Sequence, residues 1–401
     1  MDLRGKSTRK WKVIVGLTLS LIVAGFVVPS QSMAAAATLL ARSEALASTT
    51  SSPSTTVPQS TTTTTVKSAT TTIGSTTTTT PSTTSTTVPS GSTINVTTNL
   101  QAAINAAPNG STIYVPAGSW GGATINGRSN LTIYGSRTTS IIGTLSIAGG
   151  SSNIVVHDVT LKDSYSTDWN PGIQIESLKG GHFYNMDFVG MGYSAINAAN
   201  STVSWDANIT NIEVDHNNVY GPVGEYGFYV GRGCYYWNLH DNNVGQCVGK
   251  TTPPHAFYIQ DSAYITVQNN YAYGTTASNG FAYKVAVDSY GQGHSHDVQF
   301  LNNKSDGNFG GLWLVATVNC TASGNQFLNN TNQAVQFWAN SSNVTLQNNT
   351  MTSALYGITF STDALWASNV HLIGNNVTAP IKLSLSGGPS SMIVESTGNN
   401  W

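Results

Sequence analysis

The stretch "AVQFWANSSNVTLQNN", residues 334–349, contains two short segments of alternating side chains, and the second segment ends in two asparagines. Val335 and Phe337 occupy every other position of the first segment, and Val344 and Leu346 do the same in the second. A period of two is typical of β-strands with one buried face. Asparagine tolerates the left-handed backbone of a tight corner better than other non-glycine residues, so we expect the chain to turn there.

Both segments recur along the chain. The first begins with a small residue each time, in GIQIE from Gly172, AINAA from Ala195, GFYVG from Gly227, AFYIQ from Ala256, GFAYK from Gly280, GLWLV from Gly311 and GITFS from Gly357. The second ends at Asn218, Asn243, Asn270, Asn303, Asn325, Asn349, Asn376 and Asn400, at separations of 25, 27, 33, 22, 24, 27 and 24 residues. A repeat of this length predicts a solenoid, with asparagines of successive coils pairing their side-chain amides. Its coils should be strands, because Gly, Asn and β-branched residues dominate.

The segment "LQAAINAAPNGSTIYVPAGSW", residues 100–120, predicts a short helix, a break at Pro108 and Gly110, and a strand at Thr112–Val115. With this segment and the repeat, the chain from about Ile94 to Trp401 resembles the single-stranded right-handed parallel β-helix of the pectate-lyase-like superfamily. The resemblance implies an all-β fold, a right-handed parallel β-helix solenoid of about ten to eleven coils. It also implies a short N-terminal capping helix at Leu100–Ala107, which would cover the apolar end of the coil stack.

The N-terminal residues have a different composition from the repeat. Basic residues between Arg4 and Lys12 precede the apolar run Val13–Val28 and a small-residue stretch, so we expect residues 1–36 to be a secretory signal peptide. An uncleaved membrane anchor is the alternative. Residues 37–93 are rich in Ser, Thr and Pro, which predicts a disordered linker and a possible site of O-linked sugars. Residues 94–401 should form the β-helix domain of a secreted or cell-surface protein.

Composition limits the partners of this domain. Charged residues make up 8% of the chain, and from Asn95 onward nine Lys and Arg face sixteen Asp and Glu. A nucleic acid would meet no attractive electrostatic field, so we expect no nucleic-acid partner. We also expect no stable membrane span beyond the signal segment, and a monomeric protein. Cys320 falls at an inward position and should be a core residue. Cys234 and Cys247 are candidates for a disulfide, and no C-x-x-C pair indicates a zinc ribbon.

One face of the predicted coils carries aromatic and amide side chains. If the small residue of each first strand is position zero, positions two and four point outward. Position two reads Gln174, Asn197, Tyr229, Tyr258, Ala282, Trp313, Gln336 and Thr359. Position four reads Glu176, Ala199, Gly231, Gln260, Lys284, Val315, Trp338 and Ser361.

Such a face suits sugars, because rings cover the apolar side of a pyranose while amides reach its hydroxyls. The sequence therefore predicts a groove for a polysaccharide or glycan. The predicted substrate-binding residues are Gln174, Glu176, Asn197, Tyr229, Tyr258, Gln260, Trp313, Gln336 and Trp338. The alternative is that a loop covers the aromatic rings.

Charged groups beside this face are the candidate catalytic residues. Arg232 and Asp261 occupy position five of successive coils, so we expect a salt bridge, with Lys284 near the same carboxylate and its pKa raised by it. Lys284 or Arg232 would act as base or carboxylate clamp in β-elimination, with Asp261 orienting it. Simple charge pairing is the alternative. His255 is a candidate acid or base at the groove edge.

The 33-residue coil contains the insertion "DSYGQGHSHD", residues 288–297, which we expect to form a loop beside the groove. His294, His296 and Asp297, together with Asp288, are candidates to hold a metal or to shuttle a proton. The sequence otherwise predicts no cofactor and no defined metal site, and calcium is the cation that we retain as an alternative.

Enzyme signatures of this fold are mostly missing. Polygalacturonases carry N-x-D, D-D, G-H-G and R-x-K motifs, of which only "GHS" at Gly293 is similar here. "VDHNN" at Val214 is similar to the W-x-D-H stretch of one pectate lyase family, and "PPHAF" at Pro253 to the D-P-H-D of mannuronan epimerases. If the protein is an enzyme, we expect a polysaccharide lyase rather than a glycoside hydrolase, because no outward carboxylate pair spans the groove. The alternative function is a non-catalytic glycan-binding or cell-envelope surface module.

Overall fold

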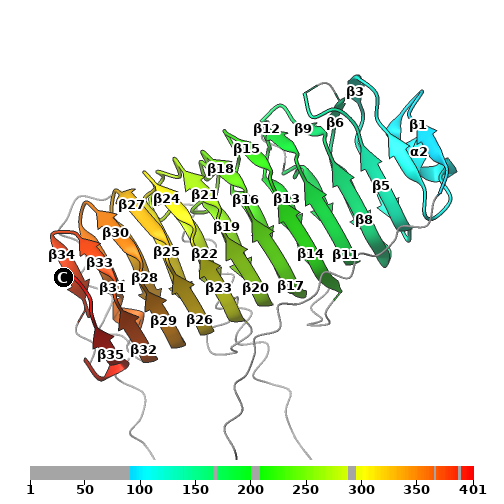
Figure 1. The fold of residues 1–401 in the computed structure, drawn as a ribbon. Coiled ribbons are helices and arrows are strands. Elements are labelled where there is room, and N and C mark those ends of the chain that lie inside the picture. Colours follow the sequence, from blue (N-terminus) through cyan, green and yellow to red (C-terminus); the bar gives the residue numbers. More distant parts are fainter. Residues whose placement is uncertain are drawn as a thin grey trace, which may run out of the picture. The chain divides into compact units, whose positions relative to one another are not determined.

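Each strand of the repeat pairs in parallel with the strand three elements further along the chain, so the backbone winds through three sheets (Figure 1). The computed structural model describes residues 91–138, 140–165, 169–199, 208–287, 295–364, 367–386 and 390–401. These residues belong to one compact unit, Thr83–Trp401. The predicted signal peptide and nearly all of the predicted linker lie outside the described residues.

The first sheet has 13 strands and the other two have 11 each. The first sheet comprises β1 (Thr93–Asn95), β2 (Thr112–Tyr114), β5 (Ser129–Tyr134), β8 (Ser151–His157), β11 (Leu178–Tyr184), β14 (Ile209–Asp215), β17 (Cys234–His240), β20 (Ala263–Gln268), β23 (His296–Leu301), β26 (Val318–Ser323), β29 (Ser342–Gln347), β32 (Ser368–Ile373) and β35 (Ile393–Thr397). The second sheet comprises β4 (Ala123–Asn126), β7 (Leu145–Ala148), β10 (Ile173–Ile175), β13 (Ser194–Ala198), β16 (Tyr226–Val230), β19 (His255–Gln260), β22 (Phe281–Ala286), β25 (Gly310–Val315), β28 (Gln333–Trp338), β31 (Tyr356–Phe360) and β34 (Ile381–Ser384). The third sheet comprises β3 (Gly118–Trp120), β6 (Ser140–Ile142), β9 (Thr160–Lys162), β12 (Asp187–Val189), β15 (Asn218–Tyr220), β18 (Asn243–Gly245), β21 (Tyr271–Tyr273), β24 (Lys304–Asp306), β27 (Gln326–Asn330), β30 (Thr350–Ser353) and β33 (Asn376–Thr378).

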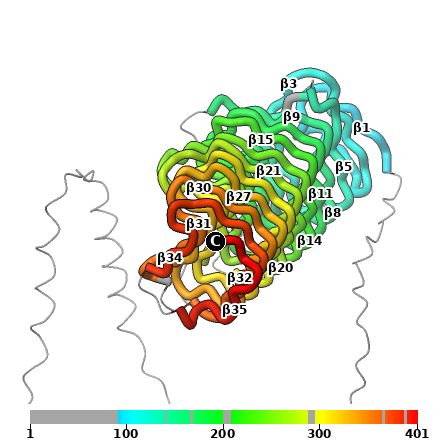
Figure 2. Tube along the Cα trace, turned by 60° about the vertical axis from the view of Figure 1, so that its left-hand side comes forward, coloured from blue at the N-terminus to red at the C-terminus, as the bar shows by residue number. Residues whose placement is uncertain are grey.

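The coils stack directly on one another, as the tube in Figure 2 shows. Parallel strands joined through crossovers follow the right-handed sense, and the prediction of an all-β right-handed parallel β-helix is confirmed. Two short 3₁₀ helices, η1 (Thr362–Ala364) and η2 (Ser390–Met392), interrupt the last coils. Within the described residues, no helix has the length and apolarity needed to cross a membrane.

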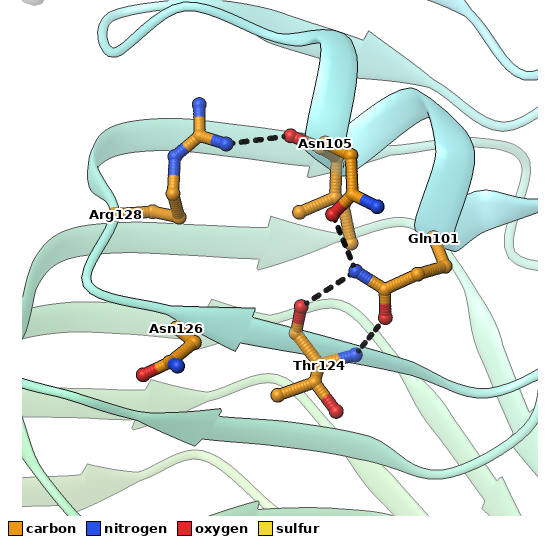
Figure 3. A pocket seen from close by; sticks show the side chains of 6 residues that line it. Gln101, Asn105, Thr124, Asn126 and Arg128 are labelled. Carbon is orange, nitrogen blue, oxygen red and sulfur yellow. Dashed lines mark hydrogen bonds between the residues drawn. The ribbon is translucent and has the colours of Figure 1, made fainter.

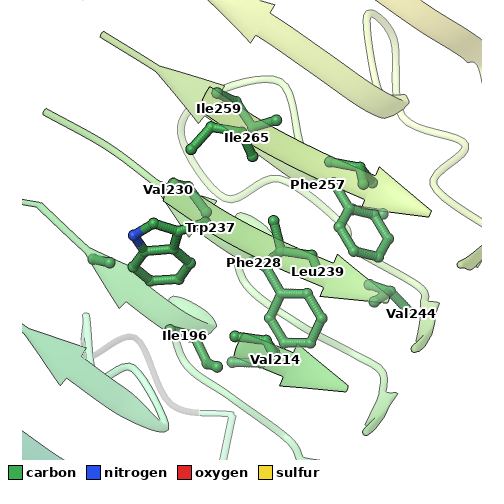
Figure 4. Close-up of a cluster of buried hydrophobic side chains, with 14 of the residues drawn as sticks. Ile196, Val214, Phe228, Val230, Trp237, Leu239, Val244, Phe257, Ile259 and Ile265 are labelled. Atoms are coloured by element: carbon green, nitrogen blue, oxygen red, sulfur yellow. The ribbon is translucent and has the colours of Figure 1, made fainter. Parts of the chain in front are cut away.

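Inward side chains of the three sheets fill the interior of the coils (Figure 4). Ile196, Phe228 and Phe257 lie in one column of the second sheet, and the rings of Phe228 and Phe257 meet edge to face at 5.4 Å between centroids. The small residue at the start of each first strand also faces this core. A Cβ atom at Gly227 would lie 2.3 Å from Cγ1 of Val244, so a larger residue there would displace core side chains.

Helix α2 (Leu100–Ala106) lies beside the first coils (Figure 1). The Asn99 side chain caps it by accepting a hydrogen bond from Ala102 N–H at 2.7 Å. It ends at Ala107, whose extended backbone is the conformation favoured before proline. The Arg128 guanidinium donates to the carbonyls of Ile104 and Ala107, which satisfies the helix C-terminus. The apolar residues of helix α2, Leu100, Ala103 and Ile104, are buried in the core.

A ladder of asparagines, buried except for the half-buried Asn399 at its end, runs along one corner of the coils, between the first and third sheets. Its members are Asn217, Asn242, Asn270, Asn303, Asn325, Asn349, Asn375 and Asn399. Nδ2 of Asn242 donates to Oδ1 of Asn270 at 3.0 Å and to the Val214 carbonyl at 2.9 Å. Oδ1 of Asn242 accepts from both the backbone N–H and Nδ2 of Asn217, each at 3.0 Å. The predicted pairing of amides between coils is therefore present.

The position of the left-handed corner differs from the prediction. The residue with positive φ directly precedes each ladder asparagine, as in His216, Asp241, Asn269 and Asn302, with φ between 53° and 55°. Two different positions thus favour asparagine for different reasons. The corner residue supplies the backbone conformation, and the ladder residue supplies the buried amide.

The three cysteines are buried free thiols. Cys320 lies in the core as predicted, and burial raises its pKa and that of Cys247 to about 12. The disulfide considered for Cys234 and Cys247 is not formed.

The ladder gives a direct test of its contribution to stability. Replacement of Asn242 by Ala removes the side-chain partner of the Val214 carbonyl and of two N–H groups of Asn217 in a buried corner, while the Asn270 amide oxygen keeps its bond from the backbone N–H of residue 242. Each unsatisfied buried group costs about 1–3 kcal/mol, so we expect Asn242→Ala to lower the free energy of unfolding by about 3 kcal/mol or more. Urea and thermal denaturation followed by circular dichroism would measure the change.

Asn243 is the matched control, because it is the next residue, is exposed, and its side chain donates to Asn218 of the preceding coil at 3.0 Å. Asn243→Ala should change stability by about 0.5 kcal/mol or less. Equal losses for the two variants would contradict a special role of the buried ladder.

Candidate functional site

The outer face of the second sheet carries one continuous column of side chains. In register, the column reads Gln174, Asn197, Tyr229, Tyr258, Lys284, Trp313, Gln336 and Thr359. At about 4.8 Å per coil, Gln174 and Lys284 are about 19 Å apart along this column. The predicted binding residues therefore lie along an extended face and do not converge on one point.

Lys284 occupies a different place from the predicted one. The strand in its coil pairs Tyr258 with Lys284 and Phe257 with Tyr283, so the small residue at position zero is Ala282 rather than Gly280. Ala282 is fully buried in the core and is not part of the outer face. In the sequence, Gly280 and Ala282 both fitted the small position of the repeat. In the structure, Gly280 belongs to the preceding turn, where its N–H donates to the Ala277 carbonyl.

The Lys284 ammonium lies between two aromatic rings. Its Nζ is 4.5 Å from the ring centroid of Tyr258 and 4.4 Å from that of Trp313. Burial lowers the pKa of Lys284 to about 8, while the ring faces favour the charged form through cation–π attraction. The expected rise of this pKa by Asp261 is wrong, because strand register pairs Tyr258 with Lys284, and Asp261 comes three residues further along, where its N–H donates to the Ala286 carbonyl.

His255 lies behind these rings rather than at a groove edge. Its side chain is buried, with ring centroids of Tyr258 and Trp313 at 5.2 and 6.0 Å. Its Nδ1 accepts a hydrogen bond from Phe281 N–H at 3.2 Å, so the neutral ring carries its proton on Nε2. Burial and the nearby Lys284 charge lower the pKa of His255 well below its usual range.

Sequence reasoning missed Tyr226 and Phe281, which belong with His255 to the outer aromatic cluster. Tyr226, His255 and Phe281 each directly precede the small residue of their strand. Strict alternation predicts that a side chain at this position points into the core. Both the small residue and the next one face inward, so alternation fails at the start of the strand. The sequence signal that could have revealed the outward Phe281 ring was the glycine at the paired position of the next coil, Gly310. A Cβ atom there would lie 2.3 Å from the Phe281 ring.

Arg232 and Asp261 are close to one another, as the repeat predicted. The Arg232 guanidinium is 4.0 Å from the Asp261 carboxylate, whose side chain is 1% exposed. Because Arg232 is more exposed, at 26%, its guanidinium is the part of this pair that a ligand can reach.

A pocket of about 270 Å³ opens in the middle of the face. It is lined by Tyr258, Gln260, Lys284, Ala286, Val287, Trp313, Val315 and Trp338. Trp338 stacks on Trp313 at 5.1 Å and donates its indole N–H to Asp363 at 2.7 Å. The Trp313 indole N–H is buried and has no hydrogen-bond partner among the described residues. This pocket combines rings, an ammonium and one amide with no described carboxylate.

Amide pairs lie in the same face on both sides of the pocket. Asn197 donates to Gln174 at 2.6 Å, and Gln333 donates to Gln336 at 2.8 Å. Tyr229 donates its hydroxyl proton to Gln260 at 2.7 Å. Glu176, just after β10, is exposed and lies in the coil of Gln174, far from Lys284.

The predicted loop cluster is only partly described. Asp288 and His294 lie outside the described residues. His296 bonds Asp297 at 2.6 Å on the first sheet, away from the column of Lys284 on the second.

A larger pocket of about 430 Å³ lies beside helix α2 (Figure 3). Its polar groups already bond one another or the backbone, since Gln101 bonds Asn105 and Thr124, and Arg128 bonds helix carbonyls. This pocket therefore joins the helix to the first coils, and it offers fewer free groups to a ligand.

Comparisons with known proteins agree with the β-helix fold. Residues 211–400 match the family described as periplasmic copper-binding protein (NosD). Among solved structures, the A-module of the Azotobacter vinelandii mannuronan C-5 epimerase AlgE6 is similar with a TM-score of 0.57 and 18% identity, covering 75% of this chain and 93% of that chain. The chain has the pectate-lyase-like right-handed β-helix fold.

Two further solved structures share this β-helix. A GH87 α-1,3-glucanase catalytic domain in complex with nigerose has a TM-score of 0.55 and 14% identity, covering 77% of this chain and 68% of that chain. The DFA-IIIase of Arthrobacter chlorophenolicus has a TM-score of 0.50 and 15% identity, covering 78% of this chain and 91% of that chain. No curated protein sequence matches the β-helix significantly.

The site geometry predicts an unusual titration of Lys284. With a pKa of about 8 instead of 10.5, roughly half of its side chain should be neutral at pH 8. NMR of selectively labelled lysines would follow the titration, with the Lys284→Gln spectrum assigning the signal. A midpoint near 10.5 would show that the rings keep the ammonium as stable as in water.

Proposed function

We propose that the outer face of the second sheet binds a polysaccharide along the coil axis, with the pocket at Lys284 as its central subsite. The observation that carries this proposal is the ammonium held between Tyr258 and Trp313 on an otherwise aromatic and amide-lined face. Sugar rings stack on such aromatics, and the partly exposed Trp338 lines the same pocket. At about 270 Å³, the pocket suits a short part of a chain rather than a large ligand.

Charge favours an acidic sugar. From Asn95 onward acidic residues outnumber basic ones by sixteen to nine, yet the face brings Lys284 and Arg232 to its surface without a described carboxylate in the pocket. A uronate carboxylate would complement these cations. The names of similar folds give further support, because the epimerase acts on mannuronan and the glucanase domain is in complex with nigerose.

β-Elimination is the reaction that the side chains support best. In a uronate polymer a base removes the C5 proton, the C4–O bond breaks, and a C4–C5 double bond forms while the leaving oxygen takes up a proton. Lys284 is the candidate base, because a pKa of about 8 leaves a useful neutral fraction near neutral pH. Arg232 would bind the sugar carboxylate, with Asp261 holding its guanidinium, and His255 would support the rings behind the site.

Hydrolysis fits less well, because the usual mechanism requires two carboxyl groups across the bond and the pocket lining contains none.

A non-catalytic glycan-binding module is the second candidate. The two ring contacts of Lys284 favour it, since they stabilise a binding cation at the expense of a neutral base. Either function suits a secreted or cell-surface protein, which the N-terminal sequence predicts.

Binding should depend on the aromatic side chains. Tyr258→Ala and Trp313→Ala should each weaken binding of polyuronates such as alginate or polygalacturonate by about 1–3 kcal/mol, or roughly tenfold to a hundredfold. Calorimetric titration of a panel of acidic and neutral polysaccharides would measure this. Tyr220→Ala is the control, because Tyr220 is an exposed tyrosine on the third sheet. Binding unchanged in both aromatic variants would remove the face from consideration.

Turnover should depend on Lys284. If the protein is a lyase, Lys284→Gln should lower the rate of unsaturated uronate formation by roughly a hundredfold or more, as for loss of a positioned base. Lys304→Gln is the matched control, because Lys304 also contacts a tyrosine ring, at 4.7 Å from Tyr271, but on the third sheet. Binding by the unaltered protein without unsaturated or reducing ends would instead support the glycan-binding module.

A further inference from the structure

A second group of reactive side chains lies on the outer face of the first sheet. His182 comes from β11, Glu213 and Asp215 from β14, and His240 from β17. Strand register pairs His182 with Glu213 and Asp215 with His240. Because Glu213, Asp215 and their partners alternate along the strands, all four side chains project from the same face. The second sheet, with Lys284, is a different face of the coils.

Short contacts join these four side chains. Nε2 of His182 is 2.5 Å from Oδ1 of Asp215 and 3.9 Å from Oε2 of Glu213. Nε2 of His240 is 3.1 Å from Oε1 of Glu213. His182, Glu213 and Asp215 each offer one ligand atom within 4.8 Å of the others, and Asp215 belongs to a second such group with His216 and His240. In a tetrahedral site with bonds of about 2.0–2.2 Å, donor atoms lie about 3.3–3.6 Å apart, which is within the range of the contacts between these side chains.

The outer contacts orient the donors. Asp241 bonds Nδ1 of His240 at 2.8 Å, which leaves Nε2 of that ring directed at the cluster. His216 bonds Oδ2 of Asp215 at 2.7 Å, which leaves Oδ1 for the other side. A carboxylate on the far nitrogen of a histidine is the arrangement that fixes metal-ligating imidazoles.

Hydrogen bonds within the cluster shift the pKa values of Asp215 and His240. Burial would raise the pKa of Asp215, but hydrogen bonds from His182 and His216 outweigh it and lower the pKa. Burial would lower the pKa of His240, but its bonds to Asp241 and Glu213 raise it. These hydrogen bonds therefore favour an ionised Asp215 carboxylate in the middle of the cluster.

We propose that His182, Glu213 and Asp215, with His240 as the fourth ligand, bind a divalent transition-metal ion. Imidazole nitrogens together with carboxylate oxygens suit ions such as Zn²⁺, whereas Ca²⁺ prefers an all-oxygen site. The Asp215 side chain is 10% exposed and His182 is 35% exposed, so the ion would sit at the surface of the sheet, with the four side chains completing its tetrahedral coordination.

The test is a calorimetric titration of the untagged full chain with Zn²⁺ at pH 7.5, and with Ca²⁺ as a comparison. We expect one Zn²⁺ per chain, and much weaker binding of Ca²⁺. Asp215→Asn and His182→Ala should each weaken Zn²⁺ binding by roughly a hundredfold or more, and circular dichroism would confirm folding. The more exposed His182 keeps the test valid if Asp215→Asn does not fold.

Controls separate this site from other histidines. His371 and Glu395 form a similar pair on the first sheet, at 2.9 Å, without a third ligand in the described residues. Glu395→Gln and the double variant His294→Gln/His296→Gln should therefore leave Zn²⁺ binding unchanged. Affinity should fall at pH 5, because protons compete for the histidines. Absence of stoichiometric binding, its survival in both cluster variants, or its loss in either control would overturn the proposal.

Discussion

The spacing between parallel coils is the constraint on which the rest of the structure depends. Strands in a sheet lie about 4.8 Å apart, and a primary amide can bridge this distance with one hydrogen bond. In the ladder from Asn217 to Asn399 each amide bonds the next coil and also a backbone group, at 2.8–3.1 Å in its interior. Coils of different length, up to 33 residues, still return to this corner in register. Loop length can therefore vary between coils, because the asparagine corner keeps the strands in register.

Register at the corner decides what each outer face presents. A column contains one side chain per coil, so neighbours in space come from residues some 25 positions apart. Lys284 meets Tyr258 and Trp313 only because its coil is in phase with the coils on either side. The same rule places His182 beside Glu213 and Asp215 beside His240 on another sheet. Both clusters are products of coil stacking rather than of any local motif.

The repeat in the sequence was sufficient for the fold, because small residues, period-two strands and asparagine corners recur in nearly every coil. The repeat was not sufficient to predict, in every strand, which residues face the core and which face outward. Two small residues, Gly280 and Ala282, fitted the pattern equally well, and only core packing selects Ala282. Alternation also fails where two successive residues face the core, which moved His255 behind the aromatic rings. The histidines of the first sheet escaped notice because their partners are distant in sequence.

The asparagine ladder is also directional. Each amide oxygen in it accepts from the coil on its N-terminal side, and from Asn217 to Asn375 one N–H of each amide donates to the coil on its C-terminal side, beginning where Asn217 accepts from Met186 N–H at 3.0 Å. Aligned amide dipoles add, as peptide dipoles do in an α-helix, and chains of hydrogen bonds polarise one another. The column therefore carries partial negative charge at its Asn217 end. That end lies in the coil of Glu213 and Asp215, where the fold itself favours a cation.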